Sequence, residues 1–541
     1  MRKWLFLLLV LLPGIYLRVC GLQWGLPVGK FFHSTMYHPD ESGTIEDIAD
    51  MNPRKLDFRV RLNAFRGTAQ IYMTAAWLGL AKVTHAVKIV PSYGYYKENP
   101  GEFTKLFVAA RSLSVLFGIA TILLLFFSGG IFYGSPGTGF LAAFFLAIAP
   151  LHAVWSHYIG TDAILTFEVC LLLILSRRGM ETGRYYILSG ILAGITIATK
   201  YSALPVLIIP LTARLLAKKS LFDKPTLFYF CAVAAGFVIG NPYVVIDPGW
   251  LISTLRKTID ITVTNTARTG DAFGSVPGII YYLTTAPKYS LGLPLALLSA
   301  SGLLYAAFKR EKTDLLLLPF ILLLLVELSL PPWRLVRWFM PFVPLLCLLA
   351  ARFVLLSRKR FFLAALAAAV SAYTLFYTAS YVRTMATEDV RDASSRWIEE
   401  NIAENSRIAV PRMFFWNPAI LTSLYWFNET EPFRKNIKKY KVLQTPSVQE
   451  LSAAHPDYVI ISDYEYYPAL NLKGKYPNPQ ASELFNKLSG SGDYTLIKKF
   501  EKSPSLFGIK PIGGFYPHDW RYPFPTLLVF KAEKDKPAKK R

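Results

Sequence analysis

The chain has 541 residues, of which 53% are hydrophobic and 18% are charged, and its mean hydropathy is +0.34. Soluble domains are about a quarter charged, so this composition excludes one large soluble core and predicts a polytopic membrane protein. The net charge of +23 is spread between apolar segments, as topology signals are, which argues against a nucleic-acid-binding protein.

Apolar runs recur from residue 4 to residue 382. Many of them approach the ~20 residues that a helix needs to cross a bilayer. They predict eleven membrane-spanning helices, at 4–23, 105–127, 139–153, 162–176, 185–199, 201–217, 226–245, 289–308, 314–330, 336–356 and 361–382.

Basic residues predict how these helices are oriented. Arg2 and Lys3 precede the first span, and the positive-inside rule assigns the basic loops to the cytoplasm. The segment 67–88 has a short apolar core and would reverse every later loop if it crossed, so we expect an interfacial or re-entrant helix there. The segments that then face outward, which in a bacterium is the periplasm, are 36–43, 161–163, 246–288 and the C-terminus.

The composition changes from about residue 384. The stretch "SSRWIEENIAENSRIAV" predicts an amphipathic helix followed by a strand, and "HPDYVIISDY" predicts a buried strand. We therefore expect a mainly α fold in two parts. A membrane module covers residues 1–383, and a small soluble α/β domain outside the membrane covers residues 384–541.

Two adjacent carboxylates, Asp40 and Glu41, follow the first span in "MYHPDESG". Acidic residues favour helix N-termini, so capping of a helix that starts here is one interpretation. The other is a general base at the membrane surface. Transfer of a sugar from a lipid phosphate needs no general acid, because the phosphate leaves as an anion. It needs cations to stabilise that anion and one carboxylate to take the proton of the acceptor hydroxyl.

Further candidates lie at the same predicted outer ends. Asp162 begins a span in "HYIGTDAILTF", where it either caps the helix or assists the first carboxylate. Lys200, with Tyr201 beside it, lies at an outer turn between two apolar helices. Its ammonium group either snorkels to the interface or contacts a phosphate.

Arg334 and Arg337, in "PPWRLVRWFMPFVP", break the positive-inside pattern at an outer boundary. They serve either as ligands of an anionic lipid phosphate or, with the neighbouring tryptophans, as an interfacial anchor. His38, His152 and His157 also fall on the outer side. Their spacing is not that of a metal site, so we assign them a structural or substrate-contact role.

Together these motifs resemble those of the polyprenyl-phosphate-dependent glycosyltransferases of the GT-C class. "HPDE" is similar to their acidic motif. The order of "SHYIGTDAILTFEVCLLLIL", "GILAGITIATKYSALPVLIIPL", "GNPYVVIDP" and "VRWFMPFVPLL" resembles the superfamily of protein O-mannosyltransferases and lipid A aminoarabinose transferases (families 39 and 83). The resemblance covers about residues 1–385.

This resemblance implies a GT-C fold of about 11 transmembrane helices, with juxtamembrane helices in the first outer loop. It implies that Asp40 is the base, that Glu41 is the second acid of the motif and that Asp162 is the carboxylate of the second outer loop. Lys200 and Arg337 match basic positions near the donor phosphate. A "KPP"-like lysine motif of the aminoarabinose transferases is absent, and in "LNAFRGTAQIYM" Arg66 is the candidate to replace that lysine.

The expected function is an inner-membrane glycosyltransferase, a hexosyl- or pentosyltransferase. It moves a sugar from undecaprenyl- or dolichyl-phosphate to a protein, lipid A or glycan outside the cytoplasm. No cofactor is certain, and a divalent cation stays open. The alternatives are a transporter or flippase of a lipid-linked sugar and a structural subunit. The acids lie at the outer edge, and the chain shows no convincing internal repeat, which favours the transferase.

Overall fold

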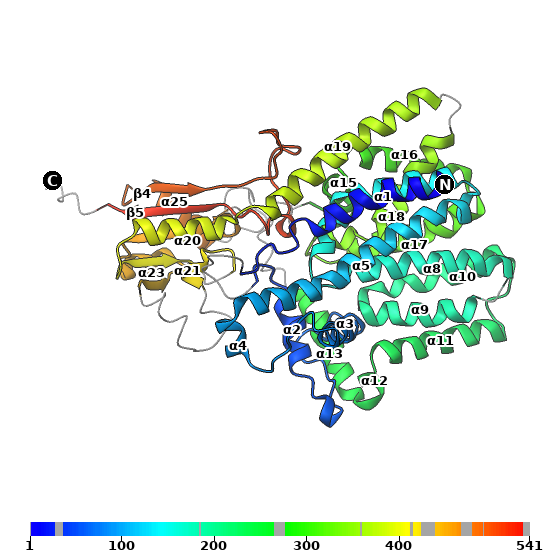
Figure 1. The fold of residues 1–541 in the computed structure, drawn as a ribbon, viewed down its shortest axis with the longest axis horizontal. Coiled ribbons are helices and arrows are strands. Elements are labelled where there is room, and N and C mark those ends of the chain that lie inside the picture. Colours follow the sequence, from blue (N-terminus) through cyan, green and yellow to red (C-terminus); the bar gives the residue numbers. More distant parts are fainter. Residues whose placement is uncertain are drawn as a thin grey trace.

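The computed structural model describes residues 2–27, 36–182, 185–264, 276–356, 360–411, 415–422, 439–466, 479–490 and 492–533. Figure 1 shows a bundle of helices and, at one end of it, a small sheet with its own helices. The long helix α19 (Arg360–Ala386) connects the two parts. The expectation of a mainly α fold with a small C-terminal α/β part is confirmed.

Helices follow the apolar segments in chain order, and each of the eleven predicted spans coincides with one or two of them. The elements of the bundle that precede α19 are α1 (Arg2–Val19), α5 (Pro100–Tyr133), α6 (Pro136–Ile148), α7 (Pro150–Val154), η2 (Trp155–His157), α8 (Asp162–Thr182), α9 (Tyr186–Thr199), η3 (Tyr201–Leu207), α10 (Ile208–Leu216), α11 (Lys224–Gly240), α14 (Gly278–Ile280), η5 (Tyr281–Thr285), α15 (Ala286–Leu291), α16 (Leu293–Lys309), α17 (Lys312–Ser329), η6 (Val336–Phe339) and α18 (Phe342–Leu356).

The helices of the bundle differ in whether they are long enough to cross a membrane. By length and composition, Pro100–Tyr133 and Phe361–Asn401 are long and apolar enough to span a bilayer. The pair Pro136–Ile148 and Pro150–His157, bent by 63°, makes a third span if it is counted as one. Shorter apolar helices account for six more of the predicted spans, among them Tyr186–Thr199 and Lys224–Gly240.

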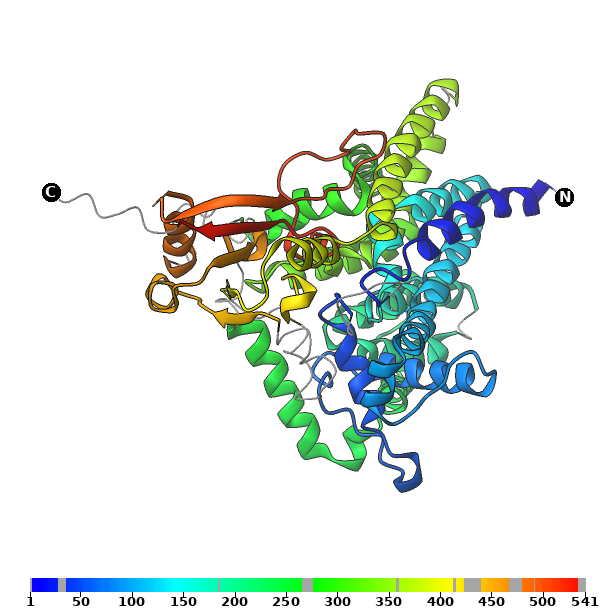
Figure 2. The same ribbon diagram turned by 60° about the vertical axis from the view of Figure 1, so that its left-hand side comes forward.

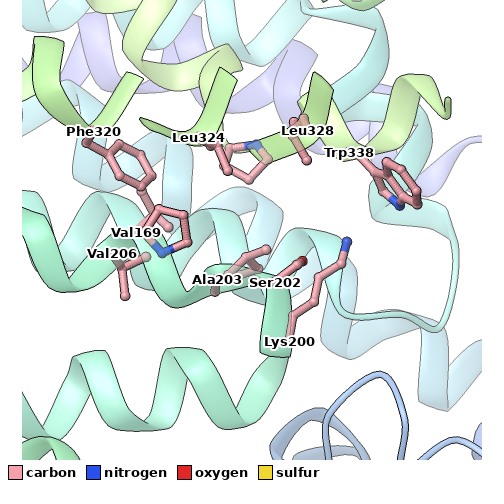
Figure 3. A pocket seen from close by; sticks show the side chains of 12 residues that line it. Val169, Lys200, Ser202, Ala203, Val206, Phe320, Leu324, Leu328 and Trp338 are labelled. Carbon is pink, nitrogen blue, oxygen red and sulfur yellow. The ribbon is translucent and has the colours of Figure 1, made fainter. Parts of the chain in front are cut away.

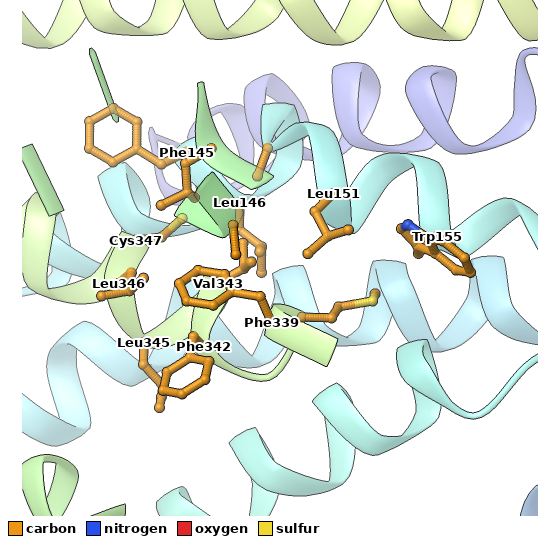
Figure 4. Close-up of a cluster of buried hydrophobic side chains, with 14 of the residues drawn as sticks. Phe145, Leu146, Leu151, Trp155, Phe339, Phe342, Val343, Leu345, Leu346 and Cys347 are labelled. Atoms are coloured by element: carbon orange, nitrogen blue, oxygen red, sulfur yellow. The ribbon is translucent and has the colours of Figure 1, made fainter. Parts of the chain in front are cut away.

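The core of the bundle forms where α18 packs on α6. Figure 4 shows that their apolar side chains interdigitate and that Trp155 lies at one end of this cluster. Phe145 and Leu146 of α6 and Val343 and Cys347 of α18 are fully buried. A close-packed core of this kind holds η2 and η6, which border the cluster, in fixed positions.

The segment between α1 and α5 forms helices that do not follow the bundle axis. In Figure 1, α3 (Ala69–Val83) is seen end-on while α5, α8, α9 and α11 are seen from the side, so α3 runs across the bundle. This arrangement agrees with the interfacial helix expected at 67–88. The other elements outside the bundle axis are α2 (Glu41–Ala49), η1 (Pro53–Lys55), α4 (Tyr93–Glu98), α12 (Tyr243–Ile246) and α13 (Pro248–Thr264).

A five-stranded mixed sheet forms the C-terminal part, with the strand order β2-β1-β3-β5-β4. Alternate residues are buried on both faces: Ile460 contacts the cluster that includes Ile398 of α20, and Val459 contacts the cluster that includes Leu484 of α25. Its elements are α20 (Val390–Asn401), β1 (Arg407–Val410), α21 (Ala419–Thr422), β2 (Lys441–Gln444), α23 (Val448–Ala454), β3 (Tyr458–Ser462), α25 (Pro479–Gly490), β4 (Tyr494–Phe500), η7 (His518–Trp520) and β5 (Leu527–Ala532).

The connection between β4 and β5 leaves the sheet and returns to the bundle. Figure 2 shows this orange-to-red segment running beside α19. Tyr373 of α19 donates to the Pro511 carbonyl at 2.9 Å, and Tyr381 donates to the Trp520 carbonyl at 2.6 Å. The strands therefore follow the bundle in sequence, α19 continues past the boundary expected at residue 384, and residues 511–520 join the two parts in space.

Candidate active site

Asp40 lies between two arginines at the end of the bundle that faces the sheet. Its Oδ1 accepts a hydrogen bond from Arg66 Nη2 at 2.8 Å, and its Oδ2 forms an ion pair with Arg337 Nη1. Asp40 occupies the N-cap position of α2, but its side chain makes no capping hydrogen bond. The carboxylate is therefore held by the arginines, and the capping interpretation of Asp40 does not apply.

The environment of Asp40 keeps it ionised. Burial alone would raise the pKa of this carboxyl, but Arg337 and Arg66 together hold it well below its usual range. The side chains of Asp40, Arg66 and Arg337 are 16%, 37% and 13% exposed, so Arg66 is the partner most open to solvent. A molecule that reaches this site meets a charged carboxylate and two cations.

His38 lies beside the carboxylate inside an aromatic cage. Its ring stacks on Tyr158 with a centroid distance of 4.2 Å and meets Trp155 and Tyr522 edge-on. Burial lowers the pKa of His38 to about 3, so the ring is neutral. The Asp40 backbone N–H lies 3.4 Å from His38 Nδ1, which links the ring to the carboxylate's own backbone.

Gly67 allows the loop that carries Arg66 to approach the end of α9. Its φ is +133°, and a Cβ atom there would lie 2.5 Å from the Thr199 carbonyl oxygen, so a side chain does not fit. The Tyr201 N–H donates to the Arg66 carbonyl at 3.2 Å. Arg66 and the residue pair Lys200–Tyr201 are thereby brought to the same place.

Asp162 and Lys200 form a second ion pair of the site. Lys200 Nζ lies 2.9 Å from Asp162 Oδ1, and both side chains are largely buried. Asp162 is the first residue of α8, and Lys200 follows the last residue of α9 in an extended conformation. Asp162 is also close enough to Arg337 to interact with it electrostatically. The two ion pairs therefore belong to one charged region.

An apolar cleft opens beside Lys200. The cleft is narrow and open to solvent, and Figure 3 shows Lys200 at one end of it, with its ammonium group directed toward Trp338. The cleft lies between α17 on one side and α8 with η3 on the other. The apolar side chains that line it are Leu165, Val169, Ala203, Pro205, Val206, Phe320, Leu324, Leu328 and Pro341.

Glu41 does not line this cleft, and both of its carboxylate oxygens accept hydrogen bonds. Arg111 binds it through two hydrogen bonds of 2.8 and 2.6 Å, and the Ile159 N–H donates to its Oε1 at 2.9 Å. Both side chains of the Glu41–Arg111 pair are completely buried. Arg111 also donates to the carbonyls of Leu22 and Trp24. This geometry ties α2 to α5 and to the end of the first helix.

The remaining candidates lie at the edge of the site. Tyr201 accepts a hydrogen bond from Asn241 Nδ2 at 3.0 Å, which places the GNPY segment next to it. Arg334 lies in the connection between α17 and η6, whereas Arg337 belongs to η6, and the arginines that pair with Asp40 are Arg66 and Arg337. Trp333 and Trp338 pack edge-on, with ring centroids 6.3 Å apart.

Several residues of the site were not among the sequence candidates. Arg111 pairs with Glu41, Trp155 lies under the Arg337 guanidinium at 5.2 Å, and Asp519 binds the backbone of Arg337. An arginine within the apolar span 105–127 was a usable signal for Arg111, because buried charges need partners. Asp519 gave no such signal, since nothing in the sequence indicates that the β4–β5 connection returns to the bundle.

The histidines expected on the outer side take part in no cluster of possible metal ligands within the described residues. Within the described ranges, no group of three or more His, Cys, Asp or Glu side chains is placed to hold a metal ion. His152 and His157 are instead bound by Arg18 and by the Cys20 carbonyl. The structure therefore gives these two histidines packing and hydrogen-bonding roles.

Comparison with known proteins gives a family match for part of the chain. Residues 103–245 match the family model described as dolichyl-phosphate-mannose-protein mannosyltransferase. This range contains Arg111, Asp162 and Lys200, whereas Asp40 and Arg337 lie outside it. No curated protein matches the chain.

Two solved structures resemble the chain over most of its length. One is the archaeal oligosaccharyltransferase AglB from Archaeoglobus fulgidus in complex with an inhibitory peptide and a dolichol-phosphate. It has 11% identity and a TM-score of 0.49, over 89% of this chain and 72% of that one. The other is ArnT from Cupriavidus metallidurans bound to undecaprenyl phosphate. It has 14% identity and a TM-score of 0.48, over 97% of both chains.

The motifs "SHYIGTDAILTFEVCLLLIL" and "GILAGITIATKYSALPVLIIPL" both lie inside the range that the family model matches. Between residues 103 and 245, this chain therefore carries the sequence pattern of the dolichyl-phosphate-mannose-protein mannosyltransferases, and the family resemblance read from its motifs is confirmed there.

Proposed function

We propose that this protein is an integral-membrane glycosyltransferase that moves a sugar from a polyprenyl phosphate to an acceptor outside the cytoplasm. The observation that carries the proposal is the ionised Asp40 between Arg337 and Arg66. The family match over residues 103–245 supports the reaction class, because its description names a dolichyl-phosphate sugar as donor.

In the proposed reaction the acceptor hydroxyl attacks the anomeric carbon of the donor sugar. The bond between that carbon and the phosphate oxygen breaks, and the polyprenyl phosphate leaves as an anion. The proton of the acceptor hydroxyl moves to the Asp40 carboxylate, which acts as general base. Cationic side chains stabilise the negative charge that grows on the leaving phosphate. Lys200, Arg66 and Arg337 are the candidates for this role.

Asp40 is a weak base as long as both arginines bind it, because they hold its pKa well below the usual range. A donor phosphate competes with the carboxylate for the same cations. Arg66 is the more exposed of the two, so we expect it to turn to the phosphate first. Loss of one arginine raises the pKa of Asp40 and strengthens the base when the donor is bound.

The apolar cleft beside Lys200 suits the lipid part of such a donor. A polyprenyl chain needs an apolar surface, and its phosphate needs a cation at the end of that surface. Lys200 lies at the end of the cleft and is paired with Asp162. A donor phosphate bound there would replace Asp162 as the partner of Lys200. Asp162 then becomes available to orient the acceptor, and Tyr201, His38 and Arg334 are the further candidates for substrate contact.

Glu41 serves this function indirectly. Since Arg111 and the Ile159 N–H occupy its oxygens, we infer that it holds α2, and with it Asp40, in place. Helix α2, whose N-cap is Asp40, lies on the side of the bundle nearer the sheet (Figure 1). Under the proposed topology this side and the domain 384–541 face the periplasm of a bacterium, and the protein crosses its inner membrane about 11 times.

The proposal is tested by supplying the purified protein with radiolabelled polyprenyl-phosphate sugars and a membrane extract as the source of acceptors. Label that moves from the lipid to a protein, lipid A or glycan supports transfer, and the labelled product identifies the acceptor. Movement of labelled lipid across proteoliposomes with no new glycosidic bond contradicts it and indicates a transporter of lipid-linked sugars.

A further inference from the structure

Asp519, in the connection between β4 and β5, binds the backbone at the start of η6. Its Oδ2 accepts the Arg337 N–H at 2.9 Å, and its Oδ1 accepts the Val336 N–H at 3.2 Å. Asp519 is 2% exposed, so these bonds form away from solvent. We propose that Asp519 is a positioning residue that aims the Arg337 guanidinium at Asp40, a role that rests on the function proposed above.

The two hydrogen bonds fix the point from which the Arg337 side chain extends. Free N–H groups at the start of a helix prefer a negative partner, and a carboxylate satisfies two of them here. The Arg337 guanidinium then lies 5.2 Å from the centre of the Trp155 ring and pairs with Asp40. A shift of the η6 backbone would move the guanidinium away from both.

Asp519 can fix η6 only if its own turn is rigid. The next residue, Trp520, is fully buried, and its Nε1–H donates to the Tyr377 hydroxyl at 2.8 Å. The Trp520 carbonyl accepts the Tyr381 hydroxyl of α19 at 2.6 Å. The turn is thus anchored in the bundle by α19 and does not depend on η6 for its position.

A second contact ties the same segment to the loop that precedes Asp40. Arg391 of α20 donates to the Tyr522 carbonyl at 2.8 Å, and its guanidinium lies 3.9 Å from the centre of the Tyr37 ring. The Tyr37 hydroxyl donates to Asp392 at 2.6 Å. The C-terminal part therefore holds both sides of the Asp40–Arg337 pair, through Asp519 on one side and Arg391 on the other.

The consequence is that the sheet-bearing part completes the active site. Asp519 itself does not touch the substrate, because both of its carboxylate oxygens accept hydrogen bonds from backbone N–H groups. Misplacement of a reacting or stabilising group by about 1 Å can cost about 100-fold in rate. We therefore expect loss of Asp519 to lower kcat by about 10- to 100-fold, with a smaller effect on the KM for the donor.

The test compares Asp519→Asn with Asp457→Asn. Asp457 is the matched control, because its carboxylate also accepts a backbone N–H, that of Arg407 at 2.8 Å, but at the start of strands β1 and β3. Asp519→Asn should lower kcat and move the acid limb of the pH–rate profile to higher pH, since a displaced Arg337 no longer lowers the pKa of Asp40. In an Arg337→Gln background, Asp519→Asn should cost less than about twofold.

A measurement that needs no activity separates this inference from the proposed function. Phenylglyoxal modification of Arg337, followed by peptide mass spectrometry, should be several-fold faster in Asp519→Asn than in wild type and unchanged in Asp457→Asn. If wild type transfers no sugar, the proposed function fails. The phenylglyoxal measurement then still decides whether Asp519 holds Arg337.

Three results would overturn the inference. They are unchanged Arg337 reactivity in folded Asp519→Asn, a rate loss that adds fully to that of Arg337→Gln, and an equal loss in Asp457→Asn. If Asp519→Asn does not fold, Asp519→Ser replaces it, because a serine oxygen still caps a helix start. Failure of both variants to fold would show that Asp519 serves folding alone, which also contradicts a positioning role.

Discussion

Asp40 and Arg337 are 297 residues apart in the chain, yet their side chains form an ion pair at the end of the helical bundle. Arg66 binds the other oxygen of the same carboxylate at 2.8 Å. A carboxylate with two arginines stays charged when it is buried, and it gives up one of them when a phosphate competes. This relationship joins the proposed base to the proposed phosphate ligands.

The pH dependence of sugar transfer should change when Arg337 is replaced. Activity requires ionised Asp40, so the acid limb of the pH–rate profile follows the pKa of that carboxyl, which the arginines hold low. In Arg337→Gln the pKa rises, and the acid limb should move to higher pH. Arg61→Gln, which removes a partner of Asp57 in the segment between α1 and α5, is the control and should leave the limb in place.

Lys200 should contribute mainly to donor binding. A hydrogen bond to a charged group is worth ~1.5–3 kcal/mol, so Lys200→Gln should raise the KM for the polyprenyl-phosphate sugar by roughly 10- to 100-fold. Lys309→Gln serves as control, because Lys309 ends α16 and does not line the cleft. Initial rates over a range of donor concentrations measure the effect, and an unchanged KM would exclude Lys200 as a phosphate ligand.

Filling the apolar cleft should discriminate between donors by chain length. Ala203 lines the cleft and is buried, whereas the next residue, Leu204, is 58% exposed. Ala203→Phe should therefore slow transfer from a long polyprenyl donor by about tenfold or more and affect a donor with a short lipid far less. Leu204→Phe should change neither rate, and equal losses with both donors would contradict lipid binding in this cleft.

Glu41 should contribute more to the stability of the fold than Glu102 does. Removal of one partner from a buried ion pair leaves an uncompensated charge, at a cost of ~3–5 kcal/mol. Glu41→Gln should lower the thermal unfolding midpoint in detergent far more than Glu102→Gln. Glu102 pairs with the largely exposed Lys105, a kind of pair worth at most ~1 kcal/mol. Equal midpoints for the two variants would refute the tether role of Glu41.

The sequence predicts the helices and the charged residues better than it predicts their partners. Apolar runs place helices at all eleven expected spans, because a run of that length buries its backbone polar groups only as a helix. Asp40, Asp162 and Lys200 were identifiable since charges at the ends of apolar segments are costly without a role. The pairing of Glu41 with Arg111 was not identifiable, because the sequence does not show which of the two acids in "HPDE" binds an arginine of α5.

The contribution of the C-terminal part was also hidden from the sequence. Strands and an amphipathic helix after residue 384 were readable from their periodicity, and the structure confirms them at β1, β3 and α20. The return of residues 511–522 to the bundle depends on contacts such as Trp520 with Tyr377, which no local pattern indicates. Long-range packing of a connecting segment therefore decides the part of the site that sequence reasoning missed.

The most direct test of the central claim is the rate of sugar transfer by Asp40→Asn from a saturating polyprenyl-phosphate sugar, measured on purified protein. General base catalysis contributes about 10²- to 10⁴-fold, so kcat should fall by that factor. Asp50→Asn, at the exposed C-cap of the same helix α2, should retain wild-type activity. Transfer by folded Asp40→Asn at the wild-type rate would contradict the assignment of Asp40 as the base and, with it, the mechanism proposed here.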